Sequence, residues 1–193
     1  MRRLRQGRLL SLAAMRKVPL SELEDRIRSS GYFRQKAARL KTLVIFVDER
    51  YGGSLRRMFA QPTENLRQQL LALNGVGPET ADSILLYAGQ HPVFVVDAYT
   101  RRILERHAIM PASASYEDIR ELFERSLTDV PRADDRDAKA DFAHPPSPMS
   151  LARRSAVVQV YNDMHGLIVG VGKHYCLKSK PRCEACPLRG FLP

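Results

Sequence analysis

One acidic residue stands where a carboxylate could act on a substrate. Asp97 follows the apolar run from Val93 to Val96, which is too short for a helix and is expected to be buried. Helical periodicity resumes after Asp97, so its carboxylate should lie at the first turn of a helix. A carboxylate in that position can stabilise positive charge on a substrate or activate water. It can also serve simply as a helix N-cap, and the two roles are compatible.

A second feature is the segment LNGVGPETA at 73–81, which joins two amphipathic helical patterns. Its two glycines allow backbone conformations closed to other residues and leave amide N–H groups unobstructed. These amides precede a helix that begins at Pro78, where the helix dipole favours an anion. The segment is therefore expected to hold a backbone phosphate, and an ordinary tight turn is the alternative. The expected binding residues are Leu73, Gly75, Val76, Gly77 and Thr80.

The three cysteines form a third group. Cys176, Cys183 and Cys186 lie within the last 18 residues, with the spacing C-x6-C-x2-C. An odd, clustered number does not suit a disulfide framework, whereas closely spaced thiols suit a metal or cluster site in a reducing compartment. An iron–sulfur cluster, zinc bound with the help of His174, and a loop without metal all remain open.

Helical periodicity covers nearly the whole chain and defines the elements that must position these groups. Helices are expected at about 21–30, 34–50, 63–73, 78–89, 97–107, 116–127 and 152–172, with a short turn at 55–59. Ser21, Thr63 and Ser115 are the expected N-caps of three of them. His107 and His165 fall on helical faces, where we expect packing or surface roles. Residues 131–150 are rich in charge, Pro and Ala, which predicts a mobile surface loop.

Composition points to an anionic partner. The 193 residues include 31 Lys and Arg against 21 Asp and Glu, which gives a formal charge of +10. Such a positive field attracts polyanions, and nucleic acid is the obvious candidate. No apolar run of about 18 residues could span a membrane, and the N-terminal residues lack the uninterrupted apolar region of a secretion signal. We therefore expect a cytoplasmic protein, and a monomer.

The order of these motifs resembles that of the endonuclease III superfamily, the helix-hairpin-helix Gly/Pro–Asp DNA glycosylases. The hairpin at 73–81, the segment around Asp97 about twenty residues later and the cysteine loop all match, and the resemblance begins near Gly31. It implies an all-α fold of two helical lobes with the active cleft between them. A helical domain would cover 1–172, and a cysteine cluster loop 173–193. Little sequence precedes the first match at residues 20–37, so the family's N-terminal helix, with its wedge residue, is expected to be missing.

The resemblance also implies a reaction. Members of the family act on double-stranded DNA with a damaged base, which is rotated out of the duplex so that its bond to the sugar can be hydrolysed. Asp97 would lie beside that sugar. Bifunctional members carry a lysine, which forms a Schiff base, at the position of Glu79, so a monofunctional enzyme of base-excision repair is expected. The segment GVGPETADSIL at 75–85 is most similar to the 3-methyladenine branch of the family, which implies that the damaged base is an alkylated purine.

Two other functions stay open. The first is a bifunctional glycosylase and abasic-site lyase that uses a different amine, for which Lys173 is a remote candidate. The second is a truncated, non-catalytic DNA-binding protein. The cysteine loop is similar to that of endonuclease III, which implies a [4Fe–4S] cluster on Cys176, Cys183 and Cys186. Leu192 occupies the position of the family's fourth cysteine.

Overall fold

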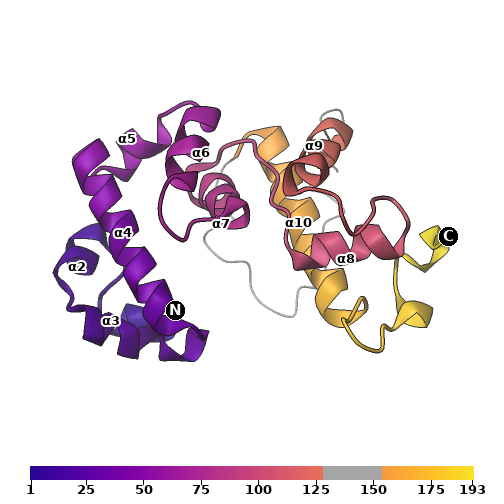
Figure 1. Cartoon of the computed structure of the whole chain (residues 1–193), viewed down its shortest axis with the longest axis horizontal. Coiled ribbons are helices and arrows are strands. Elements are labelled where there is room, and N and C mark those ends of the chain that lie inside the picture. Colours follow the sequence, from indigo (N-terminus) through magenta and orange to yellow (C-terminus); the bar gives the residue numbers. More distant parts are fainter. Residues whose placement is uncertain (128–153) are drawn as a thin grey trace. The chain divides into compact units, whose positions relative to one another are not determined.

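The structure, a computed structural model, describes residues 1–127 and 154–193 (Figure 1). Every regular element in these two ranges is helical, which confirms the expected all-α class. The chain divides into two compact units, Met1–Gly77 and Pro78–Pro193, and the boundary falls within the predicted hairpin. The loop expected at 131–150 lies outside the described residues. Within the described ranges, no helix has the length and apolar character needed to cross a bilayer.

The N-terminal unit is built around its longest helix, α4 (Phe33–Tyr51), against which α2 (Leu12–Lys17), α3 (Leu20–Ile27) and α5 (Leu55–Phe59) pack. The unit also contains α1 (Arg2–Gln6), the 3-10 turn Arg28–Ser30 and α6 (Thr63–Leu71). One core cluster consists of Leu4, Leu9, Val18, Leu23 and Ala37. Residues Ala14 and Met15 of α2 pack against this cluster. The short N-terminal helices are therefore held by apolar burial rather than by their own length.

Two predicted N-caps in this unit, Ser21 and Thr63, were wrong for the same reason. Pro19 is the N-cap of α3 and Pro62 is the N-cap of α6, so the helices begin at Leu20 and Thr63. The ring holds φ at −59° and −55°, and an extended ψ then leads directly into the helix. Ser21 therefore lies inside the first turn and does not cap it.

The C-terminal unit is organised by α10 (Ala156–His174), which packs against α8 (Ala98–Arg106) and α9 (Tyr116–Leu127). It begins with α7 (Pro78–Ser83), which continues as a π-helical stretch, Ile84–Gly89, and it ends with short 3-10 turns at Cys183–Ala185 and Arg189–Phe191. Figure 1 shows α8 lying across α10. Of the three predicted N-caps only Ser115 is correct, since its hydroxyl accepts a hydrogen bond from the Asp118 amide at 3.0 Å.

A glycine allows the close approach of α8 and α10. A Cβ atom at Gly172 would collide with the ring of Tyr99. Arg102 completes the contact by donating hydrogen bonds to the carbonyl oxygens of Gly172 (3.1 Å) and Cys176 (2.7 Å). This crossing fixes the position of the cysteine segment relative to α8, because both acceptors lie at the end of α10 or just beyond it.

Candidate active site

The apolar segment before Asp97 is buried and extended, as predicted, although it belongs to no sheet. Side chains of α9 satisfy its backbone: the Phe94 amide donates to Glu124 Oε1 at 2.9 Å, and the Val96 amide donates to the Tyr116 hydroxyl at 3.3 Å. The Phe94 ring stacks on Phe123, with a centroid separation of 4.2 Å. The buried, hydrogen-bonded segment therefore fixes the position of the Asp97 backbone.

Asp97 is the N-cap of α8, within a capping box. Its Oδ1 accepts hydrogen bonds from the Thr100 amide at 2.8 Å and the Thr100 hydroxyl at 2.9 Å, and its own amide donates to that hydroxyl at 3.4 Å. The carboxylate is 13% exposed. Its second oxygen, Oδ2, is not used by the cap. One carboxylate oxygen is thus structural, while the other faces the neighbouring side chains of the unit.

His165, from the middle of α10, lies against that second oxygen. Its Nε2 is 3.6 Å from Asp97 Oδ2, too long for a hydrogen bond but within ion-pair range. Nε2 is buried, and the Asp97 carboxylate faces it. On the other side of the ring, Nδ1 is hydrogen-bonded to the hydroxyl of Tyr87, which comes from the π-helical stretch. The packing thus aligns Tyr87, His165 and Asp97 in a row, in which His165 is buried and the other two are partly buried.

The surroundings shift the pKa values of the acids in this row. Desolvation by itself would raise the pKa of Asp97, but the close approach of the His165 ring and the two hydrogen bonds from Thr100 bring it below its usual value. Burial, followed by repulsion from Asp97, raises the pKa of Tyr87 to about 12. Asp97 is therefore held as a carboxylate and Tyr87 as a neutral phenol near neutral pH.

Glu79 belongs to the same electrostatic group. It lies in the first turn of α7, as expected. Desolvation and then the Asp97 charge raise its pKa, while His165 lowers it. The side chain is nevertheless exposed at the surface. Glu79 is thus close enough to Asp97 for the two charges to repel each other.

The two glycines of the hairpin, Gly75 and Gly77, differ in the structural requirement that each one meets. Gly75 has φ of +82°, a left-handed conformation, and a Cβ atom there would collide with Arg39 of α4. Gly77 does not have a positive φ, contrary to the sequence-based expectation, and a Cβ atom there would meet no neighbour within 4 Å. The Val76 amide is used inside the turn, where it donates to the Leu73 carbonyl at 3.0 Å. Gly77 is therefore the residue of this turn whose lack of a side chain leaves free space.

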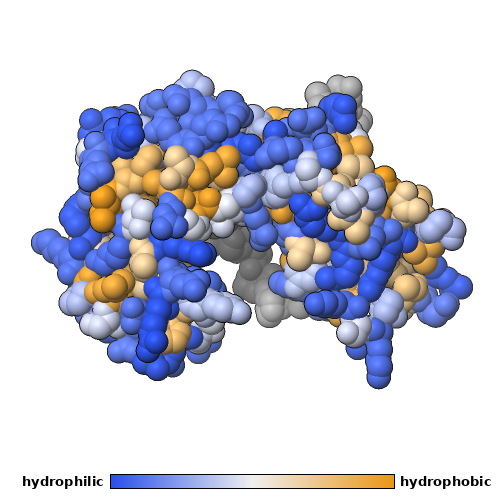
Figure 2. All heavy atoms as spheres, in the orientation of Figure 1, coloured by the Kyte–Doolittle hydropathy of each residue, from blue (hydrophilic) through white to orange (hydrophobic). Residues whose placement is uncertain are grey.

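The charge of the chain is divided unequally between the two units. The N-terminal unit contains 16 of the 31 Lys and Arg but 6 of the 21 Asp and Glu, so its formal charge is +10. The C-terminal unit contains 15 of each kind and is neutral. In Figure 2 hydrophilic side chains cover much of the visible face, and an apolar patch lies on the N-terminal unit. A polyanion would thus be attracted to the N-terminal unit.

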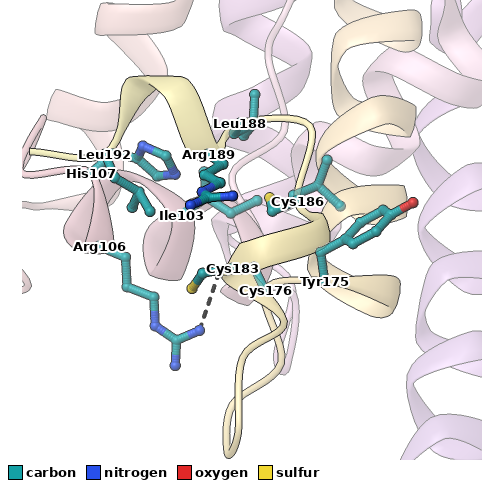
Figure 3. Close-up of a pocket in the computed structure, with 11 residues that line it drawn as sticks. Ile103, Arg106, His107, Tyr175, Cys176, Cys183, Cys186, Leu188, Arg189 and Leu192 are labelled. Carbon is teal, nitrogen blue, oxygen red and sulfur yellow. Dashed lines mark hydrogen bonds between the residues drawn. The ribbon is translucent and has the colours of Figure 1, made fainter.

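The three cysteines line one cavity at the end of the C-terminal unit (Figure 3). Cys176 is buried, while Cys183 and Cys186 are partly exposed, and all three are free thiols. Arg106 donates a hydrogen bond to Cys176 Sγ at 3.3 Å. Three donors of the right chemistry around one cavity fit an iron–sulfur cluster, apart from the fourth ligand. Leu192 lines the same cavity and has no donor atom.

The two histidines that were expected only to pack or lie at the surface both have polar surroundings. His165 faces Asp97, and His107 lines the cysteine cavity. His174, which was considered as a ligand, is exposed and is not among the residues that line this cavity. The sequence offers no local sign of these pairings, because a histidine on the apolar stripe of a helix has the same pattern in either role.

The HhH-GPD superfamily of base excision DNA repair proteins matches residues 1–128. A protein of Methanocaldococcus jannaschii named "Putative DNA repair glycosylase" is 36% identical over 184 residues, which cover 95% of this chain and 71% of that protein. Endonuclease III of Bacillus subtilis is 27% identical, and the match covers 89% of this chain and 61% of that protein.

Among solved structures, the chain is similar to the 3-methyladenine DNA glycosylase of H. pylori bound to 1,N6-ethenoadenine. The TM-score is 0.69 with 27% sequence identity, and the match covers 89% of this chain and 74% of the other. These similarities extend over both units and over the Asp97 segment, whose geometry is described above. The chain therefore belongs to the HhH-GPD superfamily of base excision DNA repair proteins.

Proposed function

We propose that the protein is a monofunctional DNA N-glycosylase, which removes an alkylated purine by hydrolysing the bond between the base and its sugar. The observation that carries the proposal is the state of Asp97: it is mostly buried, held in place by Thr100, and kept ionised beside His165. Similarity to a 3-methyladenine glycosylase supports the choice of an alkylated purine.

The chemistry required of the protein is modest. As the N-glycosidic bond breaks, its electron pair leaves with the base and positive charge develops on the sugar. A carboxylate fixed in a poorly solvated position stabilises that charge, and water then adds to the sugar. A purine that is already cationic leaves as a neutral molecule, so it needs little help from an acid. Asp97 supplies the fixed charge, and Glu79 adds a second acidic group nearby.

His165 and Tyr87 would act on Asp97 and not on the substrate. A carboxylate faces Nε2 of His165, which favours a proton on that nitrogen, and Nδ1 then accepts from the Tyr87 hydroxyl. This arrangement holds the ring against Oδ2 and lowers the Asp97 pKa. The two residues are therefore positioning residues in the proposed reaction.

Strand cleavage would require an amine at the sugar. Glu79 cannot form a Schiff base. Lys173 is exposed and lies two turns beyond His165 on α10, a rise of about 12 Å along the helix axis. An amine at that distance from the His165 turn is poorly placed to attack a sugar beside Asp97, which favours the monofunctional reaction.

Binding to DNA would rest on the basic N-terminal unit and on the hairpin glycines. A formal charge of +10 on one unit suits a phosphate backbone, and the open space at Gly77 allows a phosphate to approach the main chain. Affinity for duplex DNA should then fall steeply as salt is added, because bound counterions are released on association.

The deciding experiment is base release from methylated duplex DNA by the purified chain, with undamaged DNA as the control. The proposal expects free methylated purines and abasic sites that are cut only after alkali treatment. It also expects no covalent adduct when borohydride is added with abasic DNA. Borohydride trapping would instead indicate a lyase. A folded chain that binds DNA and releases no base would indicate a binding protein.

A further inference from the structure

The cysteine cavity lacks one donor. A [4Fe–4S] cluster is held by four protein ligands, and the chain has three cysteines. Leu192 faces the cavity at the position where a fourth cysteine would be expected, and its side chain cannot bind iron. The other residues that line the cavity are therefore the candidates for a fourth protein ligand.

His107 is placed to be that residue. It is the C-cap of α8 and lines the cavity together with the three cysteines (Figure 3). Its Nδ1 is 2.9 Å from the carbonyl oxygen of Phe191. A carbonyl can only accept, so Nδ1 carries the proton and the lone pair of the neutral ring is on Nε2. Histidines that bind metals commonly make this kind of hydrogen bond through their other nitrogen, since it fixes both the tautomer and the ring orientation.

Arg106, which precedes His107, contacts the cysteine side of the same cavity. Besides Cys176 Sγ, Arg106 donates to the carbonyl oxygens of Leu177 (2.8 Å) and Lys178 (3.1 Å). Arg106 and His107 together therefore bind the chain on both sides of the cysteine loop, at residues 176–178 and at 191. The end of α8 is thus built to position this loop.

The donor set suits a cluster. Zinc needs its ligands to converge on one point. In a four-iron cluster each ligand binds a different iron, so its donors surround a cavity, and the three cysteines line one cavity.

We propose that His107 is the fourth ligand, so that the cavity binds a [4Fe–4S] cluster through Cys176, Cys183, Cys186 and His107. One anionic thiolate is thereby replaced by a neutral imidazole. The lower negative charge should raise the reduction potential of the site relative to an all-cysteine site, because histidine ligation has that effect in other iron–sulfur centres.

The test is anaerobic reconstitution of the full chain with ferrous iron and sulfide. Iron and acid-labile sulfide are counted, and the reduced protein is examined by pulsed electron paramagnetic resonance for nitrogen coupling to the cluster. Wild type should bind about four irons per chain and show histidine nitrogen coupling. His107→Ala should lose most of the cluster. His107→Cys should keep it, lose the nitrogen coupling and show a lower potential. His174→Ala is the matched control and should behave as wild type.

Several results would overturn the assignment. One is a His107→Ala protein with full iron content and unchanged nitrogen coupling. Another is loss of the cluster in His174→Ala but not in His107→Ala. A folded wild-type chain that takes up no iron and sulfide, or that binds zinc in their place, would also overturn it. Circular dichroism of each variant shows whether it is folded. If His107→Ala does not fold, His107→Cys still tests the assignment.

Discussion

Replacing Asp97 by asparagine separates the two roles that its position combines. Asparagine caps a helix about as well as aspartate, and its side-chain oxygen can still accept from the Thr100 amide and hydroxyl, which are 2.8 Å and 2.9 Å from Oδ1. Loss of the negative charge at the start of α8 costs about 0.3–1 kcal/mol of stability. Asp97→Ala removes the cap as well and should cost about 0.5–2 kcal/mol more.

The effect on the reaction should be far larger than the effect on folding. Removal of one fixed electrostatic group from a desolvated site typically lowers a rate by about 10²–10³-fold. We therefore expect Asp97→Asn to fold with a free energy of unfolding within about 1 kcal/mol of wild type, while releasing base at least about 100-fold more slowly. Urea unfolding followed by circular dichroism gives the first quantity, and single-turnover release from methylated duplex DNA gives the second.

Two outcomes would refute this reasoning. If Asp97→Asn released base within about threefold of the wild-type rate, which is less than 1 kcal/mol, Asp97 would be only a cap. If Asp97→Asn lost as much stability as Asp97→Ala, the capping geometry would be wrong.

Three further predictions follow from the same contacts. In His165→Phe the Asp97 pKa should rise, so the acid limb of the pH–rate profile should move to higher pH, and an unmoved limb would contradict this. Ionised Asp97 contributes stability above its unfolded pKa, and this stability is lost as the pH falls through the lower folded pKa. In the variant it should therefore be lost at a higher pH. Gly172→Ala should lower the free energy of unfolding, measured in urea, by about 1–3 kcal/mol, because the new methyl group meets the Tyr99 ring of α8. The control Gly170→Ala, on the same helix, should be neutral or stabilising. Equal effects would refute the packing argument. Gly77→Ala should leave the urea midpoint nearly unchanged and weaken binding to duplex DNA several-fold by fluorescence anisotropy, and unchanged affinity would remove this residue from the interface.

Local signals were sufficient for the helices and for the position of Asp97. The apolar run before it and the helical periodicity after it require a helix start at that residue, and the capping box follows from the identity of Thr100. The same local reasoning failed at Ser21 and Thr63, where a preceding proline already satisfied the helix start. The stabilities of alternative N-cap positions differ by only a few tenths of a kcal/mol up to about 1 kcal/mol. Helix boundaries are therefore harder to predict than the helices themselves.

The family motifs also came from the sequence, because they are short and contiguous. The hairpin, the Asp97 segment and the cysteine spacing each depend on residues within about a dozen positions of one another. The carboxylate at position 79 was visible in the same way. What these motifs share is that their geometry is set by backbone conformation over a few residues, which the residue types largely determine.

Only the tertiary structure brought the histidines to their partners. Tyr87 and His165 are 78 residues apart, and His107 and Phe191 are 84 apart. Such pairs depend on how α10 crosses α8, which is decided by the combined burial of many side chains and by the absence of one at Gly172. The periodic pattern of a helix states which face is buried but not which residue of another helix that face meets. For this protein the sequence alone therefore identified the carboxylate and the cysteines, and the packing of the C-terminal unit decided which side chains surround them.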